Sequence, residues 1–237
     1  MHTQTGTQSR MNWTETLEHE ARMLVEDLDA HPGARKLFDG SIDAASYTRY
    51  LVQTYHYVRW TTPLLTKSGE RMKRSGSYSA LGELFLHKAA EERGHERWLL
   101  ADLKNLGWSA SRVAAARRGP AVNAYIAWNR YTALAGIPLA FLGTAYILEY
   151  LAVQRATRSA ERLVAARNIP HIHKAVTFLR GHGEADGEHV AELTTLLRSM
   201  TDPREQAAML LSARTTRSLY LGLFSSGARK TPERPNH

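Results

Sequence analysis

The 237-residue chain contains no cysteine. This absence excludes disulfide bonds, thiolate metal sites, iron–sulfur clusters and a cysteine nucleophile. It agrees with a cytoplasmic protein, because disulfides accumulate in oxidising compartments. The first twenty residues, MHTQTGTQSRMNWTETLEHE, contain no apolar segment, so no secretory signal peptide is expected.

Long apolar runs are also scarce. Only residues 136–153, GIPLAFLGTAYILEYLAV, approach the length of a membrane span. Pro138 lies in the first turn of this run and Glu149 lies inside it. We therefore expect a core helix surrounded by other helices, and no membrane span.

Acidic side chains are fewer than basic ones, at 23 against 31, which gives a formal net charge of +8. The basic residues are scattered along the sequence, and several lie in the stretch GARKTPERPNH at its end. A nucleic-acid site would need a clustered basic stripe with interleaved aromatic residues, and RVAAARRGP is too short for one. A solvated basic surface without a nucleic-acid partner is expected.

Alternating strand patterns and fixed-period repeats are absent, and almost everything between the two ends is typical of helix. The polar ends, residues 1–11 and 226–237, are expected to be disordered, and residues 12–225 to form one domain. Thr14 is the predicted N-cap of the first helix, and Pro63 is expected to kink or break the second. The predicted fold class is a single-domain all-α bundle of seven helices, at residues 14–31, 43–76, 77–108, 120–136, 138–168, 173–200 and 202–226.

The most informative stretch is GHGEADGEHVAEL, residues 181–193. His182, Asp186 and His189 are spaced i, i+4, i+7, so on a helix they lie within roughly 60° of one another. The same face continues as an apolar stripe, formed by Phe178, Val190, Leu193 and Leu197. Gly183 and Gly187 interrupt these turns at a cost of roughly 1 kcal/mol each relative to Ala. Metal binding by the stripe would offset that cost, and the small residues would leave room for a substrate.

Two other predicted helices also turn polar side chains toward the core. His95 and Glu92 lie on the apolar face of the 77–108 helix, with Glu91 at its edge, and the sequence does not decide which glutamate is the ligand. Glu149 lies in the most apolar helix, and points inward unless it pairs with Arg155. A buried carboxylate needs a cation or several hydrogen-bond donors.

The inward set therefore contains three histidines and three carboxylates on three helices. Its members are Glu92, His95, Glu149, His182, Asp186 and His189. Imidazole and carboxylate ligands suit iron or manganese, and a carboxylate-rich set inside a helical bundle can hold two such ions. The set predicts a buried metal site.

Lys88 is the remaining polar residue in the middle of that apolar stripe. Partial desolvation would favour its neutral form. It would then pair with Glu92 or Glu149 until metal binds, or donate a proton beside bound dioxygen as a catalytic residue. The alternative is a lysine whose stem packs in the core while its ammonium reaches water.

These motifs resemble the haem-oxygenase-like diiron oxidases and oxygenases, a family of iron-containing redox enzymes with a seven-helix bundle. The family's late His-x3-Asp-x2-His segment is matched by His182, Asp186 and His189. Its earlier central-helix glutamate is matched by Glu149, and its preceding histidine by His95. Several members have a glutamate where this chain has Lys88; others use Glu-x2-His, which Glu92 and His95 satisfy. The resemblance covers roughly residues 14–224.

The resemblance implies dioxygen activation at a centre of two irons, or of iron and manganese. It also implies a small organic substrate such as an amino acid, an amine or a fatty acid. An external electron donor and a homodimer are further expectations. It selects no single reaction among N-oxygenation, C–C cleavage and desaturation.

Two alternatives remain open at this stage. One is a haem oxygenase, because FLGTAYILEY resembles the distal helix of that family and His19 would serve as its proximal ligand. Tyr150 and Leu151 stand where that helix normally has glycines. The other is a metal-free relative or a binding module, although the absence of cysteine removes the nucleophile of a thiaminase. Tyr55, His56, Tyr57 and Trp128 are candidate pocket residues, although core packing is the interpretation that we favour for them.

Overall fold

Helix α1 (Trp13–Ala30) begins at a complete capping box. In the computed structural model, the Asn12 side chain accepts a hydrogen bond from the Glu15 N–H at 2.9 Å, and the Glu15 carboxylate accepts one from the Asn12 N–H at 2.8 Å. Two of the otherwise unpaired N–H groups of the helix start are thereby satisfied. The predicted N-cap was wrong by two residues, because the Thr14 hydroxyl donates to Asn12 Oδ1 instead.

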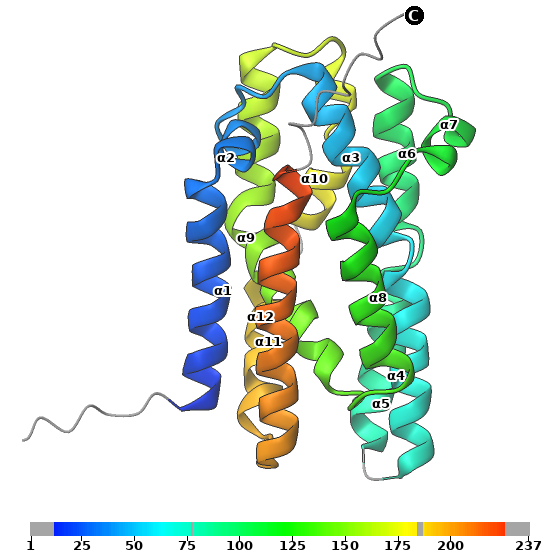
Figure 1. Ribbon diagram of the computed structural model, residues 1–237, viewed down its shortest axis with the longest axis vertical. Coiled ribbons are helices and arrows are strands. Elements are labelled where there is room, and N and C mark those ends of the chain that lie inside the picture. Colours follow the sequence, from blue (N-terminus) through cyan, green and yellow to red (C-terminus); the bar gives the residue numbers. More distant parts are fainter. Residues whose placement is uncertain (1–11, 77, 184–186, 226–237) are drawn as a thin grey trace, which may run out of the picture.

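The structure describes residues 12–76, 78–183 and 187–225, and these form helices without any β-strand (Figure 1). The all-α fold class is confirmed. The helices after α1 are α2 (Pro32–Asp39), α3 (Ala44–Val58), α4 (Thr61–Ser75), α5 (Ser79–Glu91), α6 (His95–Asn105), α7 (Ala110–Ala115), α8 (Pro120–Leu134), α9 (Ala140–Ala166), α10 (Thr177–Gly183), α11 (Gly187–Arg198) and α12 (Pro203–Ser225), with a 3-10 turn at Ile172–Lys174. The predicted ends 1–11 and 226–237 lie outside the described residues.

The number of helices differs from the predicted seven, because the described chain has twelve α-helical segments. The expected 77–108 helix divides at Gly94, whose φ of 98° is open only to a residue without a Cβ. The expected break near Pro63 is confirmed, with the proline in the first turn of α4. Pro32 is the first residue of α2, so the His31-Pro32-Gly33 signal that ends α1 also starts another helix.

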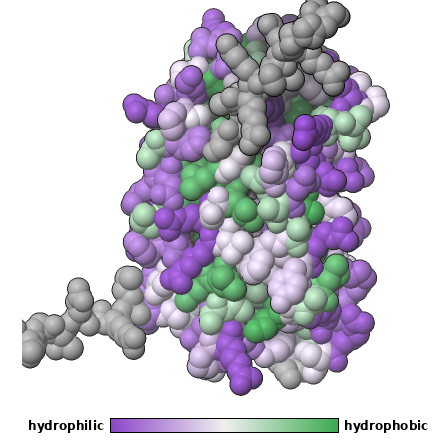
Figure 2. All heavy atoms as spheres, in the orientation of Figure 1, coloured by the Kyte–Doolittle hydropathy of each residue, from purple (hydrophilic) through white to green (hydrophobic). Residues whose placement is uncertain are grey.

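The 136–153 run supplies the first half of α9, which packs against α1, α2, α8, α10, α11 and α12. A Cβ on Gly143 of α9 would lie 2.1 Å from the Met209 carbonyl oxygen, so only glycine permits this close crossing with α12. Among the described helices, none combines the length and the hydropathy that a transmembrane segment requires. On the face shown in Figure 2, weakly polar and apolar side chains gather along the middle of the bundle, whereas hydrophilic ones cover both flanks.

Four buried polar side chains join three helices inside the core. The Thr144 hydroxyl of α9 lies 3.0 Å from Asn129 Oδ1 of α8, and on α12 it meets Ser212 at 3.0 Å and Thr216 at 2.7 Å. Each of the four residues is at most 1% exposed. Because unpaired polar groups are costly in the core, this network is satisfied only when the three helices are correctly aligned.

Candidate metal site

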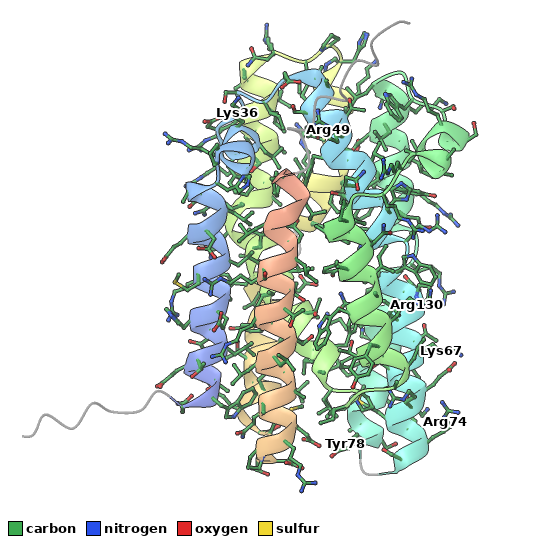
Figure 3. All side chains as sticks on the ribbon, viewed as in Figure 1. Lys36, Arg49, Lys67, Arg74, Tyr78 and Arg130 are labelled. Carbon is green, nitrogen blue, oxygen red and sulfur yellow. The ribbon has the colours of Figure 1, made fainter. Side chains whose placement is uncertain are left out.

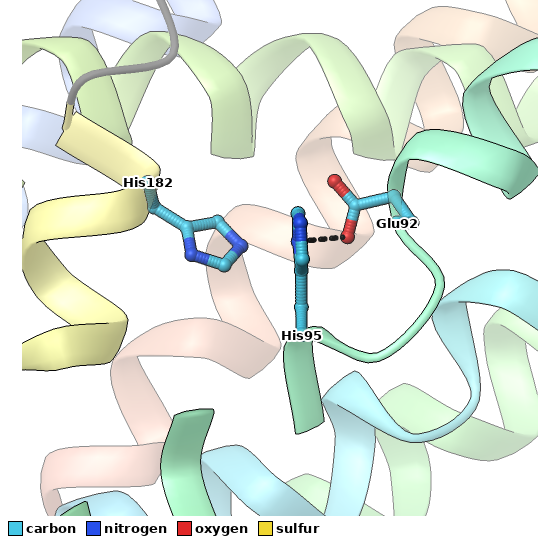
Figure 4. A group of neighbouring side chains, drawn as sticks. All are labelled: Glu92, His95 and His182. Carbon is cyan, nitrogen blue, oxygen red and sulfur yellow. Dashed lines mark ion pairs between the residues drawn. The ribbon is translucent and has the colours of Figure 1, made fainter. Parts of the chain in front are cut away.

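Glu92, His95 and His182 converge between the α5–α6 turn and α10 (Figure 4). One ligand atom of each lies within 4.8 Å of those of the other two. Glu92 is the C-cap residue that follows α5 and His95 is the first residue of α6, so the turn at Gly94 brings them together. Their contact does not depend on the continuous helix that the sequence pattern assumed.

A buried aspartate holds α6 and α10 in the positions that this cluster needs. The Asp102 carboxylate of α6 accepts the backbone N–H groups of Thr177 and Phe178, at 3.0 and 2.9 Å, and so caps the start of α10. Burial raises the pKa of Asp102 above its usual range, against the effect of these hydrogen bonds. His95 and His182 lie on the two helices that Asp102 joins. Sequence reasoning missed this residue.

The ring of His182 is oriented by its own helix. Its Nδ1 lies 3.1 Å from the Phe178 carbonyl oxygen, which can only accept a hydrogen bond. The proton therefore resides on Nδ1, and Nε2 presents a free lone pair. Burial lowers the pKa of His182, and the neighbouring His95 adds to this, so the neutral, metal-binding form is favoured at neutral pH.

His95 lies between an aromatic ring and a carboxylate. Its ring stacks on Trp98 with centroids 4.1 Å apart, and meets His182 edge-on at 4.8 Å. Its Nδ1 is 3.0 Å from Glu92 Oε2, the contact dashed in Figure 4. The two atoms lack hydrogen-bonding geometry, so the buried Nδ1 has no hydrogen bond among the described residues. Such an atom is poorly satisfied by the protein alone.

The charges in the cluster are mutually dependent. Burial alone would raise the pKa of Glu92, but His95, His182 and Lys88 together hold it below its ordinary value. Burial would likewise lower the pKa of His95, but Glu92 and Glu149 are among the carboxylates that raise it. The cluster therefore favours the carboxylate form of Glu92, and a bound metal ion would take the place of the positive charge on His95.

A cavity of about 160 Å³ opens beside the cluster, and its wall is mostly apolar. Glu92, Glu149 and His182 all line it, so Glu149 faces the same space as two members of the cluster. Arg155, the alternative partner considered for Glu149, pairs with Asp29. Of the predicted pocket aromatics, Tyr57 lines the cavity, whereas Tyr55, His56 and Trp128 do not. Tyr50, Tyr125 and Tyr220 line it without having been predicted.

Lys88 also lines this cavity, with 17% of its side chain exposed. Its Nζ pairs with Glu91 Oε2 at 2.9 Å, and Glu91 also contacts His87 at 3.1 Å. The expected pairing of Lys88 with Glu92 or Glu149 is therefore not the one observed. Of the two glutamates between which the sequence did not decide, Glu92 joins the cluster and Glu91 lies among exposed charges.

The late motif is only partly described. Asp186 lies outside the described residues, and for His189 the structure describes the helix but not the side chain. Helix α10 is described as far as Gly183 and α11 from Gly187, and residues 184–186 between them lie outside the described residues. Gly183 does not leave room for a substrate, since a Cβ there would lie 2.1 Å from Thr157 Oγ1.

Two imidazoles and one carboxylate are a ligand set typical of non-haem iron(II). Three features fit such an ion: the free Nε2 of His182, the unsatisfied Nδ1 of His95 and the carboxylate form of Glu92. Glu149 supplies a further carboxylate in the same cavity. The described residues thus fit at least one iron, with cavity space beside it for a small molecule.

Solved structures share this fold. A domain of unknown function with a haem-oxygenase-like fold from Shewanella denitrificans is 23% identical, with 92% of each chain covered and a TM-score of 0.75. A TenA homologue from Pseudomonas syringae is 14% identical. The match covers 94% of this chain and 96% of the homologue, with a TM-score of 0.74. Haem oxygenase from Leptospira interrogans is 18% identical. The match covers 91% of this chain and 99% of the haem oxygenase, with a TM-score of 0.62. The expected haem-oxygenase-like fold is confirmed.

Sequence comparison gives a closer assignment. A family model described as "Iron-containing redox enzyme" matches residues 48–221, which include Glu92, His95 and His182. No curated protein is similar enough in sequence to match.

Proposed function

Because the chain belongs to the iron-containing redox enzyme family, we propose that it is a dioxygen-activating non-haem iron oxidase or oxygenase. Glu92, His95 and His182 bind iron at the cluster, and Glu149 joins them from the cavity wall. The observation that carries the proposal is the convergence of two histidines and one carboxylate beside an apolar cavity.

The finer proposal is a centre of two metals, two irons or iron with manganese. Asp186 and His189 complete it, because the late motif would add one carboxylate and one imidazole to the ligands already described. When bound, such a centre supplies reduction of dioxygen, which an apolar protein interior cannot achieve by itself. An external donor provides electrons.

The chain's own residues prepare that chemistry. The Phe178 carbonyl keeps Nε2 of His182 deprotonated, and Trp98 fixes the plane of the His95 ring by stacking. The apolar wall excludes water and favours a small organic substrate with a largely apolar body. Lys88, held by Glu91 at the wall of this cavity, donates a proton.

Metal analysis after reconstitution with iron(II) under anaerobic conditions tests the proposal. The wild-type protein is expected to hold two irons per chain, whereas His182→Gln, with its ligand lost, loses most of them. His87→Gln is the matched control, because His87 is 69% exposed and lies outside the cluster. Equal iron content in both variants and the wild type would remove the basis of the assignment.

Asp186→Asn and His189→Gln test the second metal separately. If the centre holds two ions, each variant should retain about one iron per chain, with the first ion still at Glu92, His95 and His182. Two irons per chain in both variants would contradict the assignment of Asp186 and His189 as ligands of the second metal, and one iron per chain in the wild type would contradict the two-metal proposal.

Haem titration tests the main competing function. His19, the haem ligand considered from the sequence, is not among the residues that line the cavity. We expect no Soret band that saturates at one haem per chain. A saturating Soret band that is lost in His19→Gln would assign the protein to haem chemistry.

A further inference from the structure

Two segments of the chain contain basic residues and no acidic ones. Residues 44–69 contain three basic and no acidic residues, and residues 103–148 contain five basic and no acidic residues. Together they carry +8, which equals the formal net charge of the whole sequence. The remaining 23 basic residues (31 minus 8) balance the 23 acidic ones. These eight basic residues are therefore separated from acidic ones along the sequence, whereas the other 23 are not.

The fold brings the two segments together. Helix α3 packs against α6 and α8, and α4 packs against α8. Gln53 of α3 joins them directly, because its amide donates to the Arg117 carbonyl oxygen at 3.0 Å and its Oε1 accepts the Gly119 N–H at 2.8 Å. Figure 3 shows Arg130 and Lys67 near one another on the right flank, where α8 and α4 lie, and Arg49 higher up on α3.

Four exposed arginines, Arg59, Arg117, Arg118 and Arg130, form what we call the basic face. Arg59 and Arg118 both act on the buried His56, whose pKa is lowered first by burial and further by these two charges. Arg130 lies over the Trp60 ring, 4.9 Å from its centroid, and Arg59 over Tyr55 at 5.9 Å. Aromatic rings thus hold two of the guanidinium groups in place.

These arginines lack carboxylate partners in the part of the chain that the structure describes, since none of its salt bridges includes them. By contrast, Arg155, Arg214 and Arg217 each bind an aspartate or glutamate. An exposed, preorganised and unpaired guanidinium is well suited to bind a carboxylate from another molecule.

An apolar patch adjoins the basic face at the end of α8. Of the large hydrophobic side chains that are exposed in the described residues, three of four lie here: Tyr131 at 56%, Leu134 at 48% and Ile137 at 38%. Arg71 holds this segment, because its guanidinium donates to the carbonyl oxygens of Thr132, Ala133 and Gly136. The patch is therefore a fixed part of the surface.

We propose that the basic face and the adjoining patch of Tyr131, Leu134 and Ile137 dock an acidic protein whose carboxylates surround an exposed apolar side chain. An apolar centre with a charged rim is the usual composition of a protein–protein interface, in which arginine and tyrosine are enriched. A second copy of this chain, whose residues 12–43 contain eight acidic and three basic residues, is the competing occupant. Self-association that is lost in the Arg59→Gln/Arg118→Gln/Arg130→Gln variant would identify it and overturn the proposal. Phosphate backbones would gain little from the apolar centre. The docking site is independent of the reaction at the metal cluster.

Fluorescence anisotropy with labelled probes tests this on the full chain. The main probe is a short peptide of glutamates interrupted by leucines; the others are an all-glutamate peptide of equal length, duplex DNA and phosphatidylglycerol vesicles. The test variant is Arg59→Gln/Arg118→Gln/Arg130→Gln. The control is Arg35→Gln/Arg158→Gln/Arg204→Gln, which removes the same charge from exposed positions elsewhere. Circular dichroism verifies that both variants fold.

The glutamate–leucine peptide is expected to bind about tenfold more weakly to the test variant and nearly unchanged to the control, because local charge complementarity governs docking. Leu134→Asn should weaken binding of the glutamate–leucine peptide but not binding of the all-glutamate peptide. Equal losses in both triple variants would show a nonspecific charge effect and overturn the proposal. DNA or vesicles binding more tightly than the glutamate–leucine peptide would also overturn it, in favour of a phosphate-bearing partner.

Discussion

Gly183 of α10 lies against Thr157 of α9 so closely that a Cβ on the glycine would be 2.1 Å from the threonine Oγ1 and 2.5 Å from its backbone nitrogen. The helix cost of this glycine is thus offset by close packing of two helices. Gly181 works in a similar way two residues earlier, because a Cβ there would lie 2.5 Å from the Trp98 ring. The two glycines allow α10, which carries His182, to pack closely against α9 and α6.

Gly183→Ala should destabilise the protein, although glycine-to-alanine changes normally stabilise helices by up to about 1 kcal/mol. The added methyl group forces α10 away from α9, and we expect a loss of roughly 1–3 kcal/mol in the free energy of unfolding. Urea denaturation measures it. Thr157→Ala should relieve only part of the loss, since the Thr157 backbone nitrogen remains in place. A more stable Gly183→Ala protein would contradict the packing described here.

Asp102→Ala should weaken both the fold and iron binding. It removes the cap of α10 and leaves two N–H groups unpaired in the core, which costs roughly 2–3 kcal/mol of unfolding free energy. Because the same cap positions His182 relative to His95, iron affinity should fall as well. The measurements are thermal unfolding and iron titration. Asp202→Ala, which removes an exposed cap of α12, is the control and should leave iron affinity unchanged.

Glu20→Gln should lower stability at neutral pH by roughly 2 kcal/mol, because Glu20 is 7% exposed and accepts hydrogen bonds from Arg214 and Arg217. Burial alone would raise its pKa, but the two arginines hold it below the ordinary 4.5. A lowered folded-state pKa means that the stabilisation is present above pH 4.5 and is lost as the pH falls through the folded value. Unfolding curves of wild type and variant should therefore converge in acid. A stability difference between wild type and Glu20→Gln that grows as the pH falls would exclude this dependence on the ionised Glu20.

Lys88→Met should preserve iron content and reduce substrate turnover. The ammonium pairs with Glu91, so its loss leaves the ligands in place, whereas loss of a general acid at the cavity wall typically costs 10²–10⁴-fold in rate. Dioxygen consumption with an added reductant measures the effect, and Lys73→Met, on an exposed ion pair, is the control. Unchanged turnover would show that the lysine stem merely packs against the cavity.

The sequence predicted the all-α class, the central apolar helix and three side chains that meet in space: Glu92, His95 and His182. The sequence placed Glu92 beside His95 by assuming one continuous helix, which the structure breaks at Gly94. Glu92 and His95 are nevertheless in contact, because a tight turn, like a helical turn, brings residues three positions apart close together. A glycine between two charged stretches, GluGluArgGlyHisGlu, was the available signal for the break.

Asp102 and Trp98 were missed for different reasons. On the helical wheel that places His95 at the core, Asp102 falls within about 20° of it, so its position signalled a buried carboxylate. Trp98 lies to the side of that face, and its contact with Gly181 joins helices that are more than eighty residues apart in sequence. Periodicity along one helix carries no information about which other helix lies opposite, and the basic face escaped prediction for the same reason.

The hydroxyl network of Asn129, Thr144, Ser212 and Thr216 makes the alignment of three helices an all-or-none property. Apolar side chains tolerate a small axial shift, because any neighbour of similar size restores their contacts. Hydrogen bonds tolerate no such exchange, and a shifted α12 would leave several of these groups unbonded. Replacing all four with apolar residues of similar volume would therefore give a core that is well filled but ambiguous in register. The cavity wall, assembled from α8, α9 and α12 among others, would then lose its definite shape before the protein lost its fold.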